Sequence, residues 1–257
     1  MLELFLAELH RSWIQFRRYP FEVLGLVIVT TIMFFGLFFS ARYIAGSALQ
    51  LGDKLDSIVI GYVLWTLVLY IMSSIAAGLQ IEAQTGTLEQ VFLSQFGATT
   101  VLLMRSLAEL TIHIIIMLGS LFMIMAFTGS RLNFPPALLL PLVTVLLGAY
   151  GIALTLGSLA LLLKRVQQLF AIIQFLPLFL LATPTETWIE PLQFLANLLP
   201  MTPGAGLLRD LMARGESLNF TNLAIAFVNG GVYFAVGLLL FRVAERAAKK
   251  RGILSGY

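Results

Sequence analysis

Long apolar runs divide the chain into six segments that are separated by more polar connections. The hydrocarbon core of a bilayer is about 30 Å thick, and a helix crosses it with about 20 predominantly apolar residues. Lipid offers no hydrogen-bond partner to backbone N–H and C=O groups, so each crossing segment has to be helical. The expected spans cover residues 21–41, 57–80, 101–128, 136–162, 166–182 and 221–241. The pattern therefore predicts an all-α membrane protein with six transmembrane helices.

The first 20 residues follow a different pattern, in which apolar side chains recur at helical spacing with polar side chains mostly between them. The apolar positions are Leu2, Phe5, Leu6, Leu9, Trp13 and Phe16. This pattern is typical of an amphipathic helix that lies in the membrane interface, with Trp13 at headgroup depth. Pro20 ends this helix before the first span. Two interpretations stay open: a simple membrane anchor, or a connecting helix that also contacts a cytoplasmic partner.

The connection between the second and third expected spans carries the signals of a short helix. Thr87 can cap a helix, and Gln90 stands three residues later, as a capping box requires. Gly86 allows a sharp backbone turn before the cap, and Glu89 lies in the first turn, where a carboxylate suits the helix dipole. One face of this helix would carry Leu88, Val91, Phe92 and Gln95. An ordinary interfacial loop is the alternative.

The connection between the fifth and sixth expected spans, residues 183–219, is long and only partly polar. Prolines and glycines, among them Pro200, Pro203 and Gly206, interrupt any single helix here. The segment is too apolar for water and too broken to span, so it predicts short re-entrant helices in the outer leaflet. Non-helical backbone at that depth has to pack on protein or face a water-filled cavity. The segment would either line an exit path or form a lid that only packs.

Three ionisable residues recur at a spacing of four within the third expected span: Arg105, Glu109 and His113. Such a row faces one side of a helix, and ionisable groups within a membrane indicate function by default. A proton-coupled transporter could use them. The favoured interpretation is structural: Arg105 extends to the inner surface and pairs with Glu109, while His113 hydrogen-bonds a neighbouring helix.

The motif Asn229-Gly230-Gly231 interrupts the last span near its middle. Small residues allow two membrane helices to approach closely, and an asparagine can hydrogen-bond across their interface. The motif therefore predicts helix packing in preference to ligand binding.

The composition agrees with a membrane protein of one domain. Apolar residues make up 59% of the chain and charged residues 11%, whereas soluble domains carry about 25% charged residues. The domain divides into an interfacial helix at 1–20, a six-span core at 21–241 and a basic tail at 242–257. The chain has no cysteine, which excludes disulfides, Cys-ligated zinc and iron–sulfur clusters, and no metal-ligand spacing is present. It also has no GxxxxGK[ST] phosphate-binding loop.

The distribution of Lys and Arg predicts that both termini are cytoplasmic. Of the 16 basic residues, eleven then lie on the inner side and five on the outer side. The inner residues are Arg11, Arg17, Arg18, Arg105, Lys164, Arg165, Arg242, Arg246, Lys249, Lys250 and Arg251; the outer ones are Arg42, Lys54, Arg131, Arg209 and Arg214. The basic tail is expected to lie on anionic lipid, not on nucleic acid.

These features together resemble the permease subunits of ATP-binding cassette (ABC) exporters of the type-2 family, over essentially the whole chain. The resemblance rests on the six spans, the interfacial helix and the re-entrant element. The most specific local match is formed by Glu82, Gly86, Thr87 and Glu89. The second match, before the last span, is formed by Pro200, Thr202, Leu208 and Arg209; Gly206 belongs to the same outer re-entrant element. The chain departs from the family pattern at Gln95-Phe96-Gly97, near which the family often has a proline.

The resemblance implies a transport subunit that is not itself an enzyme. A coupling helix, formed by Glu82, Gly86, Thr87, Leu88, Glu89, Val91 and Phe92, would dock on a separate ABC ATPase subunit. ATP and Mg would bind in that partner, and this chain would bind no cofactor. A second permease, identical or related, would complete the pathway in the plasma membrane of a bacterium. The cargo would be an amphipathic or apolar lipid, drug or glycan; the alternative function is a proton-coupled secondary transporter that uses Glu109 and His113.

Overall fold

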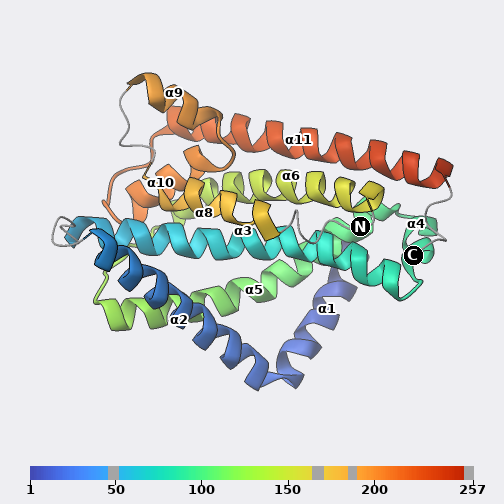
Figure 1. Cartoon of the computed structure of the whole chain (residues 1–257), viewed down its shortest axis with the longest axis horizontal. Helices are drawn as coiled ribbons and strands as arrows, with labels where there is room; N and C mark the ends of the chain where they lie inside the picture. The colour runs from blue at the N-terminus through green and yellow to red at the C-terminus, as the bar shows by residue number, and fades with distance from the viewer. Residues whose placement is uncertain (46–51, 164–170, 185–189, 252–257) are drawn as a thin grey trace.

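The computed structural model of the chain describes residues 1–45, 52–163, 171–184 and 190–251, and every regular element within these ranges is a helix (Figure 1). The helices are α1 (Leu2–Arg18), α2 (Pro20–Ala45), α3 (Gly52–Gln84), α4 (Leu88–Leu93), α5 (Ala98–Thr128), the 3₁₀ turn η2 (Pro136–Leu138), α6 (Leu139–Leu163), α8 (Phe175–Ala182), α9 (Glu190–Leu198), α10 (Thr202–Met212) and α11 (Phe220–Arg251). The expected all-α class is therefore confirmed.

In the described part of the chain, five helices are long and apolar enough to cross a membrane. They contain the stretches Pro20–Ser40, Leu55–Glu82, Ala98–Thr128, Pro136–Leu162 and Phe220–Lys250. These stretches correspond to five of the six expected spans. The remaining expected span, 166–182, is represented by the shorter apolar stretch Ala171–Ala182. Residues 164–170, with Lys164 and Arg165, lie outside the described residues, so the sixth span stays a prediction.

Helix α3 forms the centre of the bundle, with α6 running beside it and α11 packed on the other side of α6 (Figure 1). Leu67, Ile71 and Ile75 of α3 are completely or almost completely buried. Helices α6 and α11 approach each other at two glycines, because a Cβ atom added to Gly237 would collide with the carbonyl oxygen of Gly151. Such close approach increases van der Waals contact, which holds membrane helices together where lipid is as apolar as the side chains.

The two ends of the bundle carry different elements. The start of α1 and the end of α11 lie at the same end, together with α4, while α9 and α10 lie at the opposite end (Figure 1). This arrangement agrees with two termini on one side of the membrane. Residues 242–251 continue α11 without a break, so most of the predicted basic tail extends the last span.

Helix α1 stands at an angle to the bundle and packs against α5 (Figure 1). Apolar side chains such as Leu2 and Leu6 are exposed, whereas Ser12 is buried against the protein. Trp13 is partly exposed and stacks on Phe16, and the centre of its ring lies 5.4 Å from the guanidinium carbon of Arg17. Pro20 does more than end α1: it is the first residue of α2, a position where the missing N–H has no cost.

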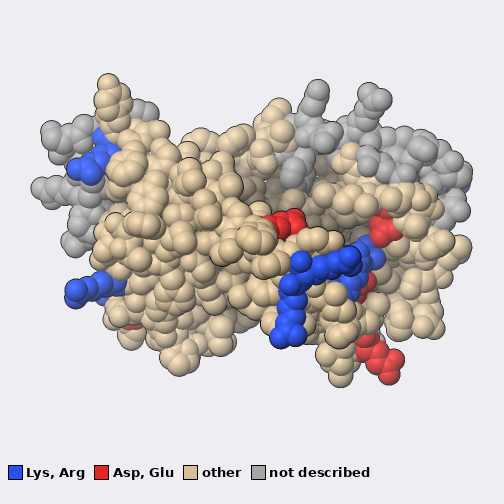
Figure 2. All heavy atoms as spheres, turned by 90° about the horizontal axis from the view of Figure 1, so that it is seen from below, with Lys and Arg blue, Asp and Glu red and all other residues tan. Residues whose placement is uncertain are grey.

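Charged side chains gather over one part of the molecular face seen in Figure 2, the part that includes α1. A wide band of uncharged surface lies beside them, and a few basic side chains occur at the far end. An uncharged band next to a charged zone is the surface that a bilayer and its interface require.

Candidate coupling site

The short helix predicted between the second and third spans is present as α4, and a glycine with positive φ lies on each side of it. Gly86 has φ of 73° and Gly97 has φ of 76°. L-residues with side chains rarely adopt this region, so glycine is the residue that such turns require. Gly97 therefore provides the turn into α5 after α4 has ended at Leu93, near the position where the family often has a proline.

The inward face of α4 is anchored in the bundle. Leu88 and Phe92 are buried, and the ammonium group of Lys249 from α11 lies 5.5 Å from the ring centre of Phe92. Val91 is half-buried, whereas Leu93 is 83% exposed. The helix is therefore fixed on its inward side, while the Leu93 side chain stays accessible.

The predicted capping box is wrong. Thr87 is the residue directly before α4, but its side chain makes no capping hydrogen bond to the helix. Its hydroxyl group instead donates to the carboxylate of Glu82 and lies 2.8 Å from the Thr85 hydroxyl. A hydrogen bond to an ionised acceptor is stronger than one between neutral groups. This difference explains why the Thr87 hydroxyl binds the carboxylate of Glu82 and does not cap α4. The side chain of Glu89 lies outside the described residues.

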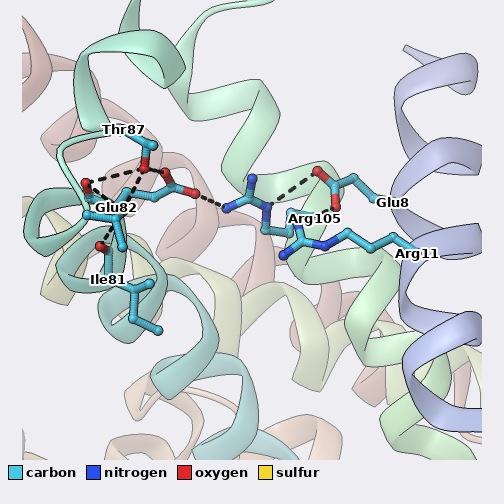
Figure 3. A network of polar contacts seen from close by, with 7 residues as sticks. Glu8, Arg11, Ile81, Glu82, Thr87 and Arg105 are labelled. Atoms are coloured by element: carbon cyan, nitrogen blue, oxygen red, sulfur yellow. Dashed lines mark hydrogen bonds and ion pairs between the residues drawn. The ribbon is translucent and has the colours of Figure 1, made fainter. Parts of the chain in front are cut away.

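Arg105 connects the start of the α4 region with α1 (Figure 3). Its Nη1 atom lies 2.6 Å from Oε1 of Glu82 on α3, and its Nε atom lies 3.4 Å from Oε1 of Glu8 on α1. Glu8 also pairs with Arg11 at 3.3 Å. The side chains of Arg105, Glu82 and Glu8 are 19%, 15% and 13% exposed, so water screens these pairs only partly.

The predicted pair between Arg105 and Glu109 is wrong. Among the described residues, the ion-pair partners of Arg105 are Glu8 and Glu82. Both partners come from other helices, and sequence spacing within α5 could not reveal them. His113 does not make the expected hydrogen bond in the described structure; its ring stacks on that of Tyr70, with centroids 3.7 Å apart and an angle of 4° between the planes.

At the other end of the bundle, α9 and α10 form a broken helical element with a turn at Met201, whose φ is 67°. Thr202 donates from its hydroxyl to the carbonyl groups of Ala196 and Leu199, the latter at 2.8 Å. Arg209 is completely buried and donates to the Leu181 carbonyl group at the end of α8. The other predicted residues of this element lie in the turn or in α10: Pro200 is partly buried, and Gly206 and Leu208 are buried.

Asn229 of α11 holds this turn in place. Its amide nitrogen donates to the carbonyl oxygens of Asn197 and Leu199, at 2.9 and 3.1 Å, and its amide oxygen accepts from the N–H of Met201 at 3.3 Å. Gly230 faces α6, because a Cβ atom added there would meet the Thr144 carbonyl oxygen. The packing role predicted for the motif is therefore confirmed at Asn229 and Gly230, whereas Gly231 has no neighbour this close.

Sequence reasoning missed Glu8, and also Glu245, which accepts from the Thr99 hydroxyl at 2.9 Å and so joins α11 to the start of α5. A signal for Glu8 was present. Polar side chains follow one another on α1 at spacings of four and three residues, at Glu8, Ser12 and Gln15. This helical spacing forms a polar stripe along one side of α1. That stripe is the face that packs on α5.

The described geometry thus places a compact short helix, held by apolar contacts and by the hydrogen bond between Thr87 and Glu82, at the end of the bundle where the chain starts. The model of the ABC-2 type transporter membrane family matches residues 3–213, a range that includes nearly all of α1, all of α4 and α10, and the predicted coupling and re-entrant residues, and that ends before α11. A comparison with individually curated proteins gave no significant match. Since the family model covers most of the 257 residues, the chain belongs to the ABC-2 type transporter family and is a multi-pass membrane permease of an ABC transporter.

Proposed function

We propose that this permease is the transmembrane subunit of an ATP-driven exporter, with both termini in the cytoplasm. It moves an amphipathic or apolar cargo out of the cytoplasm or the inner leaflet. A separate ABC ATPase subunit binds ATP and Mg, and a second permease copy, identical or related, completes the pathway. The ATPase docks on α4, and movement of the ATPase reaches the spans through that helix.

The observation that supports this proposal best is the linkage of α4 to three other helices. Glu82, at the end of α3, binds both Thr87 before α4 and Arg105 of α5. Arg105 extends the linkage to Glu8 of α1 (Figure 3). A displacement of α4 would therefore move α1, α3 and α5 as packed bodies, which is a usual form of switching between states. An interfacial loop without partners would dissipate the same displacement.

The re-entrant element at the opposite end supplies the second part of the proposal. Its turn is tied to α11 by Asn229 and its helix α10 to α8 by Arg209. Cargo would pass between the two permeases and leave beneath this element. Because α10 contacts α3, α6 and α11, a shift of the spans would move the element with them.

The experiment that tests the function is a mild-detergent purification of the tagged chain from its native membrane, with mass spectrometry of the proteins that accompany it. An ABC ATPase in stoichiometric amount, with ATP hydrolysis that depends on the permease, is the expected result. A preparation without an ATPase, both with and without crosslinking, together with transport under a proton gradient alone, would overturn the proposal. That result would favour the secondary transporter based on Glu109 and His113.

A further inference from the structure

Three cavities adjoin along α2 and α3 and together form a groove; α5 lines two of them and α8 lines the third. The inner cavity, of about 480 Å³, lies between α1, α2 and α5. The middle cavity, of about 400 Å³, lies between α2, α3 and α5, and the two share Tyr70, His113 and Ile116. An outer cavity of about 310 Å³ shares Tyr62 with the middle one and reaches Thr183 after α8. Met33 borders the middle cavity and is 53% exposed, so the groove opens towards the lipid side of α2.

The middle cavity is suited to a hydrocarbon chain. Two of its aromatic residues use their polar atoms internally: the Tyr62 hydroxyl donates to the Thr30 carbonyl oxygen at 2.6 Å, and the Trp65 Nε1–H donates to the Gln174 carbonyl oxygen at 3.3 Å. What these rings offer to the cavity is apolar surface, to which methylene groups bind favourably.

The inner cavity carries the opposite chemistry. Glu22 and Glu109 line it, and its described lining contains neither Lys nor Arg. Glu109 is half-buried and makes no hydrogen bond within the described part of the chain, although buried polar groups usually have a partner. The neighbouring guanidinium groups already bind other carboxylates: Arg105 binds Glu82 and Glu8, and Arg11 binds Glu8.

The local charge balance points to a cation. Glu8, Glu82 and Glu109 are close enough to interact electrostatically with Arg105 and Arg11. With all three ionised, the carboxylates exceed the two guanidinium groups by one negative charge, and Glu109 is the one of the three that lines the inner cavity. The stacked rings of Tyr70 and His113 lie next to it, and a tyrosine ring attracts a cation through its π face.

We propose that this groove binds a cationic amphiphile, with its ammonium group at Glu109 and its hydrocarbon chain between α2, α3 and α5. This inference rests on the proposed export function and specifies the cargo class as a single-chain amine or quaternary ammonium compound. An anionic headgroup would be repelled by Glu109 and Glu22. An uncharged headgroup would leave the carboxylate of Glu109 without a counter-charge.

The test uses the full chain in phosphatidylcholine nanodiscs and a dodecyltrimethylammonium probe with a photoreactive diazirine in its chain. Saturable labelling of peptides from α2, α3 and α5 is expected. Excess dodecyltrimethylammonium should suppress this labelling, and equal concentrations of dodecyl sulfate or dodecyl maltoside should not. Glu109→Gln should weaken binding about tenfold, which corresponds to about 1.4 kcal/mol. Glu3→Gln, an exposed change on α1, is the matched control and should bind as the unmodified chain does.

Thermal unfolding is the control that shows whether Glu109→Gln is folded. If it is not folded, a second variant still tests the groove. Val23→Trp enlarges a partly exposed side chain at the inner cavity, and it should reduce labelling by filling the space. Labelling that does not saturate, or that Val23→Trp leaves unchanged, would overturn the groove as a binding site. Equal competition by dodecyl maltoside would overturn the cationic preference.

The same preparation separates this inference from the proposed function. An associated ATPase without selective amphiphile binding overturns the cargo inference and leaves the exporter intact. Selective binding by a chain that never associates with an ATPase supports the groove and overturns ATP-driven export.

Discussion

Arg105 and Glu82 form an ion pair with 2.6 Å between Nη1 and Oε1, at the point where α3 gives way to the α4 region. The same carboxylate accepts the hydroxyl hydrogen of Thr87, the residue before α4. One acidic residue thus ties the short helix to a transmembrane helix. A coupling element needs such a tie, because force applied to a loosely attached helix would not reach the spans.

Replacement of Arg105 by methionine should destabilise the protein and reduce coupled ATP hydrolysis. The change leaves Glu82 and Glu8, which are 15% and 13% exposed, without their shared cation. Loss of one partner of a partly buried pair costs about 1–3 kcal/mol. Thermal unfolding in detergent measures this loss, and Arg18→Met, an exposed change on α1, is the control. In a double-mutant cycle, Glu82→Gln should cause a smaller loss in the Arg105→Met background; additive losses would contradict the pair.

Replacement of Glu89 by lysine should weaken association with the ATPase while leaving the permease folded. The family resemblance assigns this residue to the docking surface, and a reversed charge at an interface can cost several kcal/mol. The expected effect is at least about a tenfold loss of affinity, measured by titrating purified ATPase against the permease. Glu3→Lys is the control for a charge reversal outside α4. Unchanged affinity with Glu89→Lys would remove Glu89 from the coupling site.

Replacement of Asn229 by alanine should loosen the broken helical element formed by α9 and α10. The amide group satisfies the carbonyl groups of Asn197 and Leu199 and the N–H of Met201. Buried backbone groups left without partners cost about 1–3 kcal/mol. Limited proteolysis should show faster cleavage between α9 and α10, together with a lower melting temperature. Asn222→Ala, an exposed change on the same helix, should have little effect; equal effects of both changes would contradict the assigned role.

Replacement of Gly237 by alanine should separate α6 from α11. The added methyl group would collide with the Gly151 carbonyl oxygen, whereas a methyl group at Gly231 has no protein atom within 4 Å. Overpacking of this kind costs about 1–3 kcal/mol. The melting temperature of Gly237→Ala should therefore fall well below that of Gly231→Ala. A Gly237→Ala variant as stable as the original would show that the two backbones are not in close contact.

The sequence predicted those parts of the fold that depend on local pattern. Long apolar runs identified the helices, and glycine chemistry identified the turn before α4, because both effects act within a few residues. Asn229 was correctly assigned to packing because an asparagine within a membrane helix needs a hydrogen-bond partner. The pattern could not specify that this partner is the turn at Met201, since that contact joins residues 28 to 32 positions apart.

The errors lie at polar residues with more than one possible partner. Thr87 had the sequence signature of a cap, but the carboxylate of Glu82 competes for its hydroxyl group. Arg105 had a suitable acid one turn away at Glu109, but Glu8 and Glu82 reach it from other helices. Local spacing ranks only the partners within one helix. The tertiary arrangement decides which carboxylates approach a guanidinium group, and no periodicity within α5 contains that information.

The most direct test of the central claim is site-directed crosslinking from α4. The chain contains no cysteine, so Leu93→Cys introduces one attachment site for a benzophenone–maleimide at the exposed side of α4. Ser217→Cys places the same reagent on an exposed residue after α10, at the opposite end of the bundle. After illumination of native membranes, the account predicts that the α4 site crosslinks to an ABC ATPase and that the control site does not. An ATPase that copurifies with the permease but crosslinks equally from both sites, or only from residue 217, would contradict α4 as the coupling helix.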